Sequence, residues 1–307
     1  MTIPPSVLAV LVSAGLPVAA PPKPVPPSPD VLVKNDIPYA TVDGVKLELD
    51  FAAPKAGGPH PCVVLLHGGA WKMGSRKELS RRPPADLDFG TDGKSLTETL
   101  AERGFAAASV SYRLAPKGKF PAQIQDVKTA VRYLRANAKD LNIDPDRIAA
   151  YGFSAGGHLA ALLGTTAGLK DFEGDLYPEQ SSTVCCVVNF FGPADLSLYC
   201  ETPGIEKAFF KDFLVCTPAT KAAAFAKASP ITHASRASAP FIHIHGTADV
   251  VVPVLHSEAF HKKLVEVGAK STLVEVKGKG HGWFGRDFAD SSETAFRFLG
   301  EHLKGTK

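Results

Sequence analysis

The sequence predicts a single α/β domain: a mainly parallel sheet with helices on both faces and an antiparallel hairpin at its N-terminal edge. Short apolar runs of strand length alternate with longer helical patterns along most of the chain, which is typical of a parallel sheet. Two alternating segments precede these runs and flank Asp43-Gly44, a pair that favours a tight turn. With 307 residues, of which 45% are hydrophobic and 21% charged, the chain can bury a full core.

The predicted strands fall into two groups. The hairpin strands, at 37–42 and 45–51, alternate polar and apolar residues and therefore suit the edge of a sheet. The later strands are nearly continuous apolar runs, as expected of strands covered on both faces. These runs occupy 62–66, 105–110, 147–151, 184–190, 241–244 and 272–276.

Helical patterns separate the apolar strands and predict the layers that cover the sheet. They occupy 95–103, 122–138, 155–163, 257–267 and 290–303. The stretch 197–232 interrupts this alternation, and we expect it to form a partial cap insertion over the edge of the sheet. The domain as a whole is expected to span 31–307.

The first thirty residues differ from the rest. An apolar run at 7–16 is too short to span a bilayer and is followed by a proline-rich stretch. We expect a signal peptide at 1–20, a linker at 21–30, and a secreted or periplasmic protein. The absence of Lys and Arg before the run, and Pro21 after the expected cleavage position, argue against cleavage. An uncleaved anchor beside the membrane, a disordered tail and a cytoplasmic location therefore stay open.

Charge and cysteine content exclude several classes of function. A net charge of +3 indicates no nucleic-acid partner, and no stable membrane partner is expected. The sequence contains no C-x-x-C pair, H-E-x-x-H motif or Walker motif, so we expect neither a metal nor a cofactor. In an exported protein Cys200 and Cys216 could form a disulfide within the insertion. Three other cysteines lie in strand-like runs and suit buried positions: Cys62, Cys185 and Cys186.

The motif G-F-S-A-G at 152–156 identifies Ser154 as a candidate nucleophile. It lies between the predicted strand at 147–151 and the helix at 155–163, where a sharp turn can expose a serine hydroxyl. Glycines two residues before and after the serine remove side chains that would clash in such a turn. The alternative is a glycine-rich helix start without chemistry, which the strand-to-helix context disfavours.

A second glycine motif, H-G-G-A-W at 67–71, follows the predicted strand at 62–66. Adjacent glycines let the backbone approach a ligand and turn its amides into a cavity. We expect the amides of Gly68 and Gly69, together with that of Ala155, to form an oxyanion hole. A plain glycine turn is the alternative.

The candidate base and acid follow later strands. His281 lies on a glycine-flanked loop after the strand at 272–276 and can reach a serine at a neighbouring strand end. Asp249 follows the strand at 241–244 and can orient the imidazole. The order Ser, Asp, His agrees with that expected when the serine occupies a strand-to-helix turn. Asp195, which follows the strand at 184–190, is the alternative acid.

Three aromatic residues are expected to flank the substrate pocket: Trp71, Phe153 and Trp283. Core packing is an equally common use of such side chains. Among the other histidines, His67 is expected to fix the loop that carries Gly68 and Gly69. His158 is expected to be a packing or hydrogen-bonding residue of its helix, and His245 to serve the core and the turn.

The motifs above, with two others between them, resemble those of a known group of proteins. They are H-G-G-A-W at 67–71, S-Y-R-L-A-P at 111–116, D-P-D-R-I at 144–148 and G-F-S-A-G-G-H at 152–158. The sequence from 37 to 302 resembles the hormone-sensitive-lipase-like esterases and the acetyl xylan and feruloyl esterases of the α/β-hydrolase superfamily. It departs at Ala70, where the lipase-like form has a third glycine, and is there more similar to the xylan-esterase and kynurenine-formamidase-like branches. The resemblance implies the α/β-hydrolase fold and neither cofactor nor metal.

Together these observations predict a serine carboxylic ester hydrolase that forms an acyl-enzyme on short-chain acyl esters. Acetyl esters of a carbohydrate such as xylan are the expected substrate class. Two alternatives remain: an amide hydrolase of the arylformamidase or prolyl-peptidase type, and a non-catalytic binding domain with the hydrolase fold.

Overall fold

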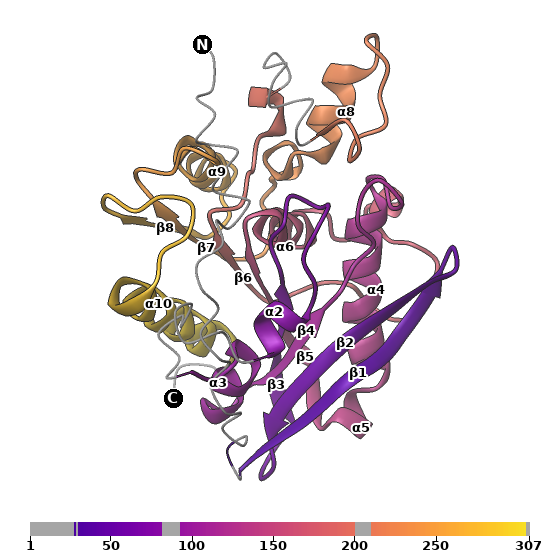
Figure 1. Cartoon of the computed structure of the whole chain (residues 1–307), viewed down its shortest axis with the longest axis vertical. Helices are drawn as coiled ribbons and strands as arrows, with labels where there is room; N and C mark the ends of the chain where they lie inside the picture. Colours follow the sequence, from indigo (N-terminus) through magenta and orange to yellow (C-terminus); the bar gives the residue numbers. More distant parts are fainter. Residues whose placement is uncertain (1–27, 29, 82–92, 200–209, 305–307) are drawn as a thin grey trace, which may run out of the picture.

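The computed structural model describes residues 28, 30–81, 93–199 and 210–304, and their centre is an eight-stranded sheet (Figure 1). The strands run in the spatial order β1-β2-β4-β3-β5-β6-β7-β8. Strand β2 is antiparallel to both β1 and β4, and every other neighbouring pair is parallel. The strands are β1 Val31–Val42, β2 Val45–Pro54, β3 His60–Leu66, β4 Ala106–Val110, β5 Ile143–Phe153, β6 Val187–Phe190, β7 Phe241–Gly246 and β8 Ser271–Val276. The predicted α/β class and its antiparallel leading hairpin are confirmed.

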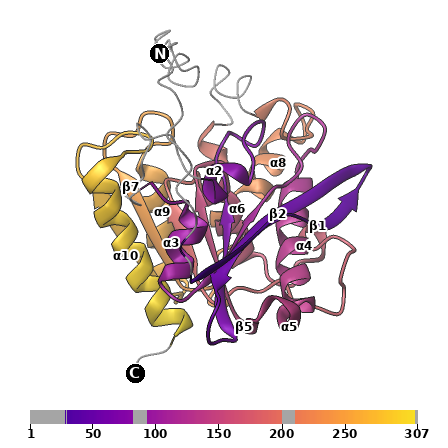
Figure 2. The same cartoon turned by 60° about the horizontal axis from the view of Figure 1, so that its bottom comes forward.

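Helices cover both faces of this sheet. Helices α4, α6 and α9 pack on one face, and α3 and α10 pack on the other (Figure 2). The α-helices are α2 Lys77–Ser80, α3 Leu96–Glu102, α4 Ala122–Ala136, α5 Ala138–Leu141, α6 Ala155–Thr165, α8 Lys221–Ala228, α9 Leu255–Glu266 and α10 Gly285–Leu303. Short 3-10 turns are η2 Lys170–Phe172, η3 Leu196–Tyr199 and η5 Pro230–His233.

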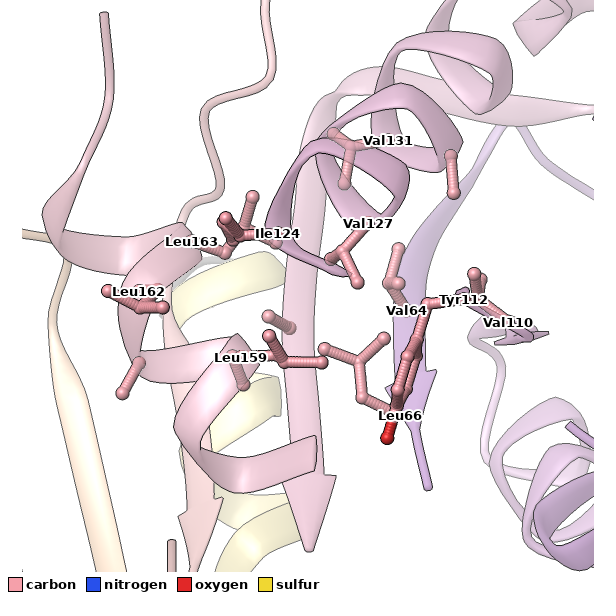
Figure 3. Close-up of a cluster of buried hydrophobic side chains, with 14 of the residues drawn as sticks. Val64, Leu66, Val110, Tyr112, Ile124, Val127, Val131, Leu159, Leu162 and Leu163 are labelled. Carbon is pink, nitrogen blue, oxygen red and sulfur yellow. The ribbon is translucent and has the colours of Figure 1, made fainter. Parts of the chain in front are cut away.

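The two faces of β3 illustrate how the core is divided. Val63 and Leu65 point to the layer of α3 and α10, whereas Val64 and Leu66 point to the layer of α4 and α6. This follows from the period-two geometry of a strand. Figure 3 shows the second layer, where the side chain of Leu159 faces that of Leu66. Burying each such side chain stabilises the fold by about 1.5–3 kcal/mol.

Element boundaries differ from the prediction in two informative places. Strand β5 extends from Ile143 to Phe153, beyond the predicted 147–151, so it carries the chain directly to Ser154. Helix α10 begins at Gly285 rather than at residue 290. The reason is Phe288, which continues the buried stripe of α10 one turn further towards its N-terminus.

The predicted insertion at 197–232 is described in part. Residues 210–232 contain α8, which Figures 1 and 2 both place near one end of α6. The predicted signal peptide at 1–20 and nearly all of the predicted linker at 21–30 lie outside the described residues, as does Cys200. Within the described part of the chain, no helix is both long enough and apolar enough to cross a membrane.

Candidate active site

Ser154 occupies a strained turn between β5 and α6. Its backbone angles are φ 52° and ψ −119°, a conformation that L-residues rarely adopt and that costs on the order of 1–3 kcal/mol. The flanking glycines are required by close packing. A Cβ on Gly152 would lie 2.1 Å from the carbonyl oxygen of Gly156, and a Cβ on Gly156 would lie 2.1 Å from that of Leu66. The sequence therefore forms a tight turn that holds the hydroxyl at the end of β5.

The structure brings Ser154, His281 and Asp249 together. His281 Nε2 lies 2.9 Å from Ser154 Oγ, and His281 Nδ1 lies 2.8 Å from Asp249 Oδ2. The first contact joins residues 127 positions apart in the chain. The alternative acid, Asp195, has a different role, because its carboxylate accepts the backbone amide of Ser197 at 3.0 Å. The predicted geometry is thus formed with Asp249 beside the imidazole.

Asp249 is buried and strongly hydrogen bonded. The amides of Val251 and Val252 both donate to its Oδ1 at 2.9 Å. His245 Nε2 lies 3.2 Å from its Oδ2, the oxygen that also contacts His281. Burial opposes ionisation of this carboxyl, but hydrogen bonds from His245, His281 and a backbone amide outweigh it and hold its pKa well below the ordinary value. The carboxylate is therefore charged at neutral pH.

His245 is a site residue whose contact with the acid the sequence analysis missed. Its Nε2 lies 2.7 Å from the carbonyl oxygen of Val252, so Nε2 carries the proton, and its Nδ1 lies 2.7 Å from Ser257 Oγ. The N–H therefore points towards both Val252 and Asp249. The only signal in the sequence is that His245 lies near the end of the strand that Asp249 follows, four residues before Asp249.

The loop after β3 lies against the nucleophile. A Cβ on Gly68 would lie 3.5 Å from the Cβ of Ser154. Gly69 has φ 103°, and a Cβ there would lie 2.2 Å from the carbonyl oxygen of Met73. Within the described residues, the amides of Gly68 and Gly69 donate to no protein atom, and Ala155 is the first residue of α6, whose amide has no intrahelical acceptor. These three amides are therefore available to an incoming oxygen.

His67 fixes the start of this loop. Its ring stacks on that of Tyr112 at 4.4 Å between centroids, and the Tyr112 hydroxyl donates to the His67 carbonyl oxygen at 2.9 Å. Burial lowers the pKa of His67 to about 4, so its imidazole is uncharged at neutral pH. After Gly69, Ala70 and Trp71 also have positive φ, at 51° and 60°, so three consecutive residues of the loop are left-handed.

A cavity of about 150 Å³ opens next to the turn at Ser154, since Gly68 and Phe153 are among its lining residues. Phe153 lines it, as does Phe191, whose ring lies 4.9 Å from that of His281. The lining residues are Gly68, Glu78, Leu79, Arg81, Lys94, Ser95, Leu96, Phe153, Phe191 and Phe288. The cavity therefore has an apolar wall near Ser154 and charged side chains among its other residues.

Two of the three aromatic residues predicted for the pocket lie elsewhere. Trp71 is 3% exposed and stacks on Phe213 at 4.3 Å, and Trp283 is 5% exposed and donates its indole N–H to Ser291 Oγ at 3.2 Å. The prediction that these tryptophans line the pocket is wrong for the described cavity. Each ring is covered by a neighbouring element, because burying a large apolar face in the core is strongly favourable.

The described residues contain no cluster of three or more His, Cys, Asp or Glu side chains arranged to hold a metal ion. Cys216 is exposed, and its predicted disulfide partner Cys200 lies outside the described residues.

A mainly parallel sheet with a serine at a strand-to-helix turn, followed in the chain by an acid and a histidine, defines the α/β-hydrolase class. Within that class the chain belongs to the BD-FAE family, whose sequence model matches residues 49–264.

The comparisons also identify similar individual proteins. Esterase LipC of Mycobacterium tuberculosis is 35% identical over 243 residues, which are 77% of this chain and 56% of that protein. The probable carboxylic ester hydrolase LipM of the same organism is 30% identical over 70% of this chain and 47% of its own length. The chain thus spans about half the length of these curated relatives.

Solved structures of esterases have the same fold as this chain. A truncated carbohydrate esterase from gut microbiota superimposes with a TM-score of 0.72 at 29% identity, covering 91% of this chain and 99% of that one. Esterase 2 of Thermogutta terrifontis with bound propionate gives a TM-score of 0.70 at 28% identity, covering 91% of this chain and 97% of that one.

Proposed function

We propose that this protein is a serine carboxylic ester hydrolase with Ser154 as nucleophile, His281 as base and Asp249 as its partner. The observation that carries this proposal is the unbroken relay of two hydrogen bonds, 2.9 and 2.8 Å long, from the Ser154 hydroxyl through His281 to a buried carboxylate. The esterases named above, similar over most of this chain, support the same chemistry.

The geometry supports a two-stage reaction. His281 Nε2 accepts the Ser154 proton as Oγ attacks the ester carbonyl carbon. The resulting oxyanion accepts hydrogen bonds from the amides of Gly68, Gly69 and Ala155. When the tetrahedral intermediate collapses, the C–O bond to the alcohol breaks and His281 returns the proton to the leaving oxygen. A water molecule then attacks the acyl carbon while His281 takes its proton, the bond from that carbon to Ser154 Oγ breaks, and His281 returns the proton to Oγ.

Asp249 stabilises the charged imidazole in both stages. Its Oδ2 accepts the Nδ1–H of His281, which leaves Nε2 free to accept the serine proton. The two backbone amides on its other oxygen fix the carboxylate in this orientation.

We further propose short-chain acyl esters as substrates, with acetyl groups on carbohydrate as the natural class. The small cavity beside Phe153 has room for a short acyl group. The carbohydrate esterase and the propionate-bound esterase found by structural comparison support this class. An exported protein, proposed from residues 1–20, would meet polysaccharide outside the cell.

The nucleophile is tested by Ser154→Ala with p-nitrophenyl acetate as substrate. We expect kcat to fall by about a million-fold or below detection, because the variant lacks the oxygen that carries the acyl group in the proposed mechanism. Ser235→Ala, at an exposed serine, is the matched control and should keep wild-type turnover. Undiminished hydrolysis by a folded Ser154→Ala variant would reject the proposed function.

The substrate class is tested by comparing p-nitrophenyl esters from C2 to C12, acetylated xylan and N-formylkynurenine. We expect the highest kcat/KM among the shortest esters and release of acetate from xylan. A preference for N-formylkynurenine would replace the ester proposal with an arylformamidase, and a preference for the longest chains would reject the short-acyl class.

A further inference from the structure

We propose that Trp71 and His158 are positioning residues. Their hydrogen bond holds residues 67–71, here called the oxyanion loop, in the conformation that presents the amides of Gly68 and Gly69 to the substrate. This inference rests on the proposed function. It gives a role to two residues that touch neither the reacting atoms nor the cavity.

The contacts of His158 fix its tautomer. The Trp71 indole donates its Nε1–H to His158 Nδ1 at 3.2 Å, and His158 Nε2 lies 2.7 Å from the carbonyl oxygen of Ala228. An indole nitrogen can only donate and a carbonyl oxygen can only accept, so Nδ1 carries the lone pair and Nε2 carries the proton. The imidazole is therefore neutral and both of its nitrogens are hydrogen bonded, one to the oxyanion loop and the other to the last residue of α8.

The environment keeps the imidazole in this state. His158 is 0% exposed, and burial lowers its pKa to about 4. At neutral pH the ring thus stays uncharged and continues to accept from Trp71. Loss of either partner would leave a polar atom unpaired in the core, which costs about 1–3 kcal/mol.

The oxyanion loop needs such an anchor because its backbone is strained. Gly69, Ala70 and Trp71 all have positive φ, at 103°, 51° and 60°. A non-glycine residue in that region costs on the order of 1–3 kcal/mol and persists only where its surroundings enforce it. The last of the three positions is the residue that His158 holds.

Trp71 is enclosed on its other sides as well. Its ring stacks on Phe213 at 4.3 Å with an interplanar angle of 11°, and its carbonyl oxygen accepts the amide of Ala115 at 2.8 Å. Packing alone holds the rest of the Trp71 side chain. The hydrogen bond from its indole N–H to His158 Nδ1 therefore fixes the orientation of the ring. Since Trp71 lies two residues beyond Gly69, that orientation sets the path of the proposed oxyanion donors.

His158 itself cannot move far. It lies on the first turns of α6, whose N-terminus follows Ser154 directly, and its amide donates to the Ser154 carbonyl oxygen at 3.0 Å. The bond to Trp71 therefore ties the oxyanion loop to the helix that carries the nucleophile. A shift of about 1 Å between such groups can cost a hundredfold in rate.

Two substitutions at one position separate the two bonds of the imidazole. His158→Asn keeps an acceptor near the position of Nδ1 but is too short to reach Ala228. His158→Gln keeps a donor near the position of Nε2 but has a methylene, which cannot accept, near the position of Nδ1. Trp71→Phe removes the indole donor and keeps an aromatic ring against Phe213, and Trp283→Phe is its control at the other buried tryptophan.

We expect His158→Gln and Trp71→Phe to lower kcat for p-nitrophenyl acetate by about tenfold with little change in KM, because oxyanion contacts act mainly in the transition state. His158→Asn and Trp283→Phe should keep kcat within about threefold of wild type. Wild-type kcat in Trp71→Phe would overturn the inference, as would equal losses in the two His158 variants or a loss confined to KM.

The hydrogen bond has a readout that needs no turnover. The chain contains two tryptophans, so a ¹⁵N-labelled sample gives two indole N–H signals, and Trp71→Phe assigns them. We expect the Trp71 signal to stay near its wild-type position in His158→Asn and to shift in His158→Gln. An unchanged Trp71 signal in His158→Gln would show that the proposed hydrogen bond is absent and would overturn the inference. A lack of esterase activity in the wild-type protein would reject the proposed function and leave the hydrogen bond itself untouched.

Discussion

The two sides of the candidate active site are held by different forces. On the β7 and β8 side, Asp249 and His281 are fixed by side-chain hydrogen bonds and two backbone amides. On the β3 side, the loop at 67–71 is fixed by left-handed backbone, close packing at Gly69 and a buried aromatic stack. On the first side, kcat should therefore be sensitive to substitutions that change hydrogen-bonding groups but keep the shape of the side chain. On the second side, kcat should be sensitive to substitutions that change the shape and add no new polar group.

The largest effect on kcat is expected from Asp249→Asn, which replaces a carboxylate by an amide of nearly the same shape. The remaining Oδ1 can still accept from Val251 and Val252, but the new amide would face His281 Nδ1 as a donor. His281 would then carry its proton on Nε2 and could not act as base, so kcat should fall by about 10⁴-fold. Steady-state kinetics with p-nitrophenyl acetate measures this, and Asp195→Asn is the control. A larger loss in the control would reassign the acid to Asp195.

The next effect comes from changing shape without chemistry, in Gly69→Ala. Its Cβ would meet the Met73 carbonyl oxygen at 2.2 Å, so the loop must move and its amides with it. We expect kcat to fall by about 10²- to 10³-fold, the loss typical of one oxyanion donor. Gly168→Ala is the matched control, since Gly168 also has positive φ but open space at the Cβ position. Equal kcat in the two variants would show that crowding at Gly69 is irrelevant to the site.

A smaller effect is expected on the hydrogen-bonded side from His245→Asn, which removes the Nε2–H donor to Asp249 and keeps a polar atom near Nδ1. The carboxylate loses one stabilising contact but keeps its two amides, so we expect kcat/KM to fall by about tenfold, or roughly 1.4 kcal/mol. Ser257→Ala, which removes the other partner of His245, should cost less. A loss in Ser257→Ala as large as that in His245→Asn would mean that His245 matters to folding rather than to Asp249.

The last effect, on stability rather than on activity, concerns histidines that are buried without charge. Burial lowers the pKa of His243 to about 3 and that of His158 to about 4, against about 6.5 in an unfolded chain. Between pH 6.5 and 4 the unfolded state binds more protons, so the free energy of unfolding should fall with falling pH by about 1.4 kcal/mol per pH unit for each such histidine.

Urea unfolding at pH 7, 6 and 5 measures that slope. His243→Leu should make the slope shallower by about one proton, because leucine has no group that titrates. The variant also removes the contact of His243 Nδ1 with Asn189 Nδ2 at 3.2 Å, so its slope is compared with wild type rather than its stability at one pH. His302→Leu, at a half-buried position near the end of α10, is the control. The same slope in wild type and His243→Leu would contradict a neutral buried imidazole.

The same contrast explains what the sequence could predict. Ser154, Asp249 and His281 were recognisable because glycines and polar residues at the ends of apolar strands are local signals, and parallel strands end at one edge. The orientation of Trp71 was not recognisable, because it depends on Phe213, 142 positions away in the chain. His245 shows a third case: a histidine at a strand end looks the same in sequence whether it serves the core or contacts the acid.

The central claim is that the Ser154 hydroxyl, activated by His281, forms the covalent intermediate. The most direct measurement is peptide mapping by mass spectrometry after titration with diisopropyl fluorophosphate. We expect one phosphoryl group per chain on Ser154, with esterase activity lost in proportion and no labelling in Ser154→Ala. Loss of activity with Ser154 unmodified, or labelling on another serine that parallels the loss, would contradict it.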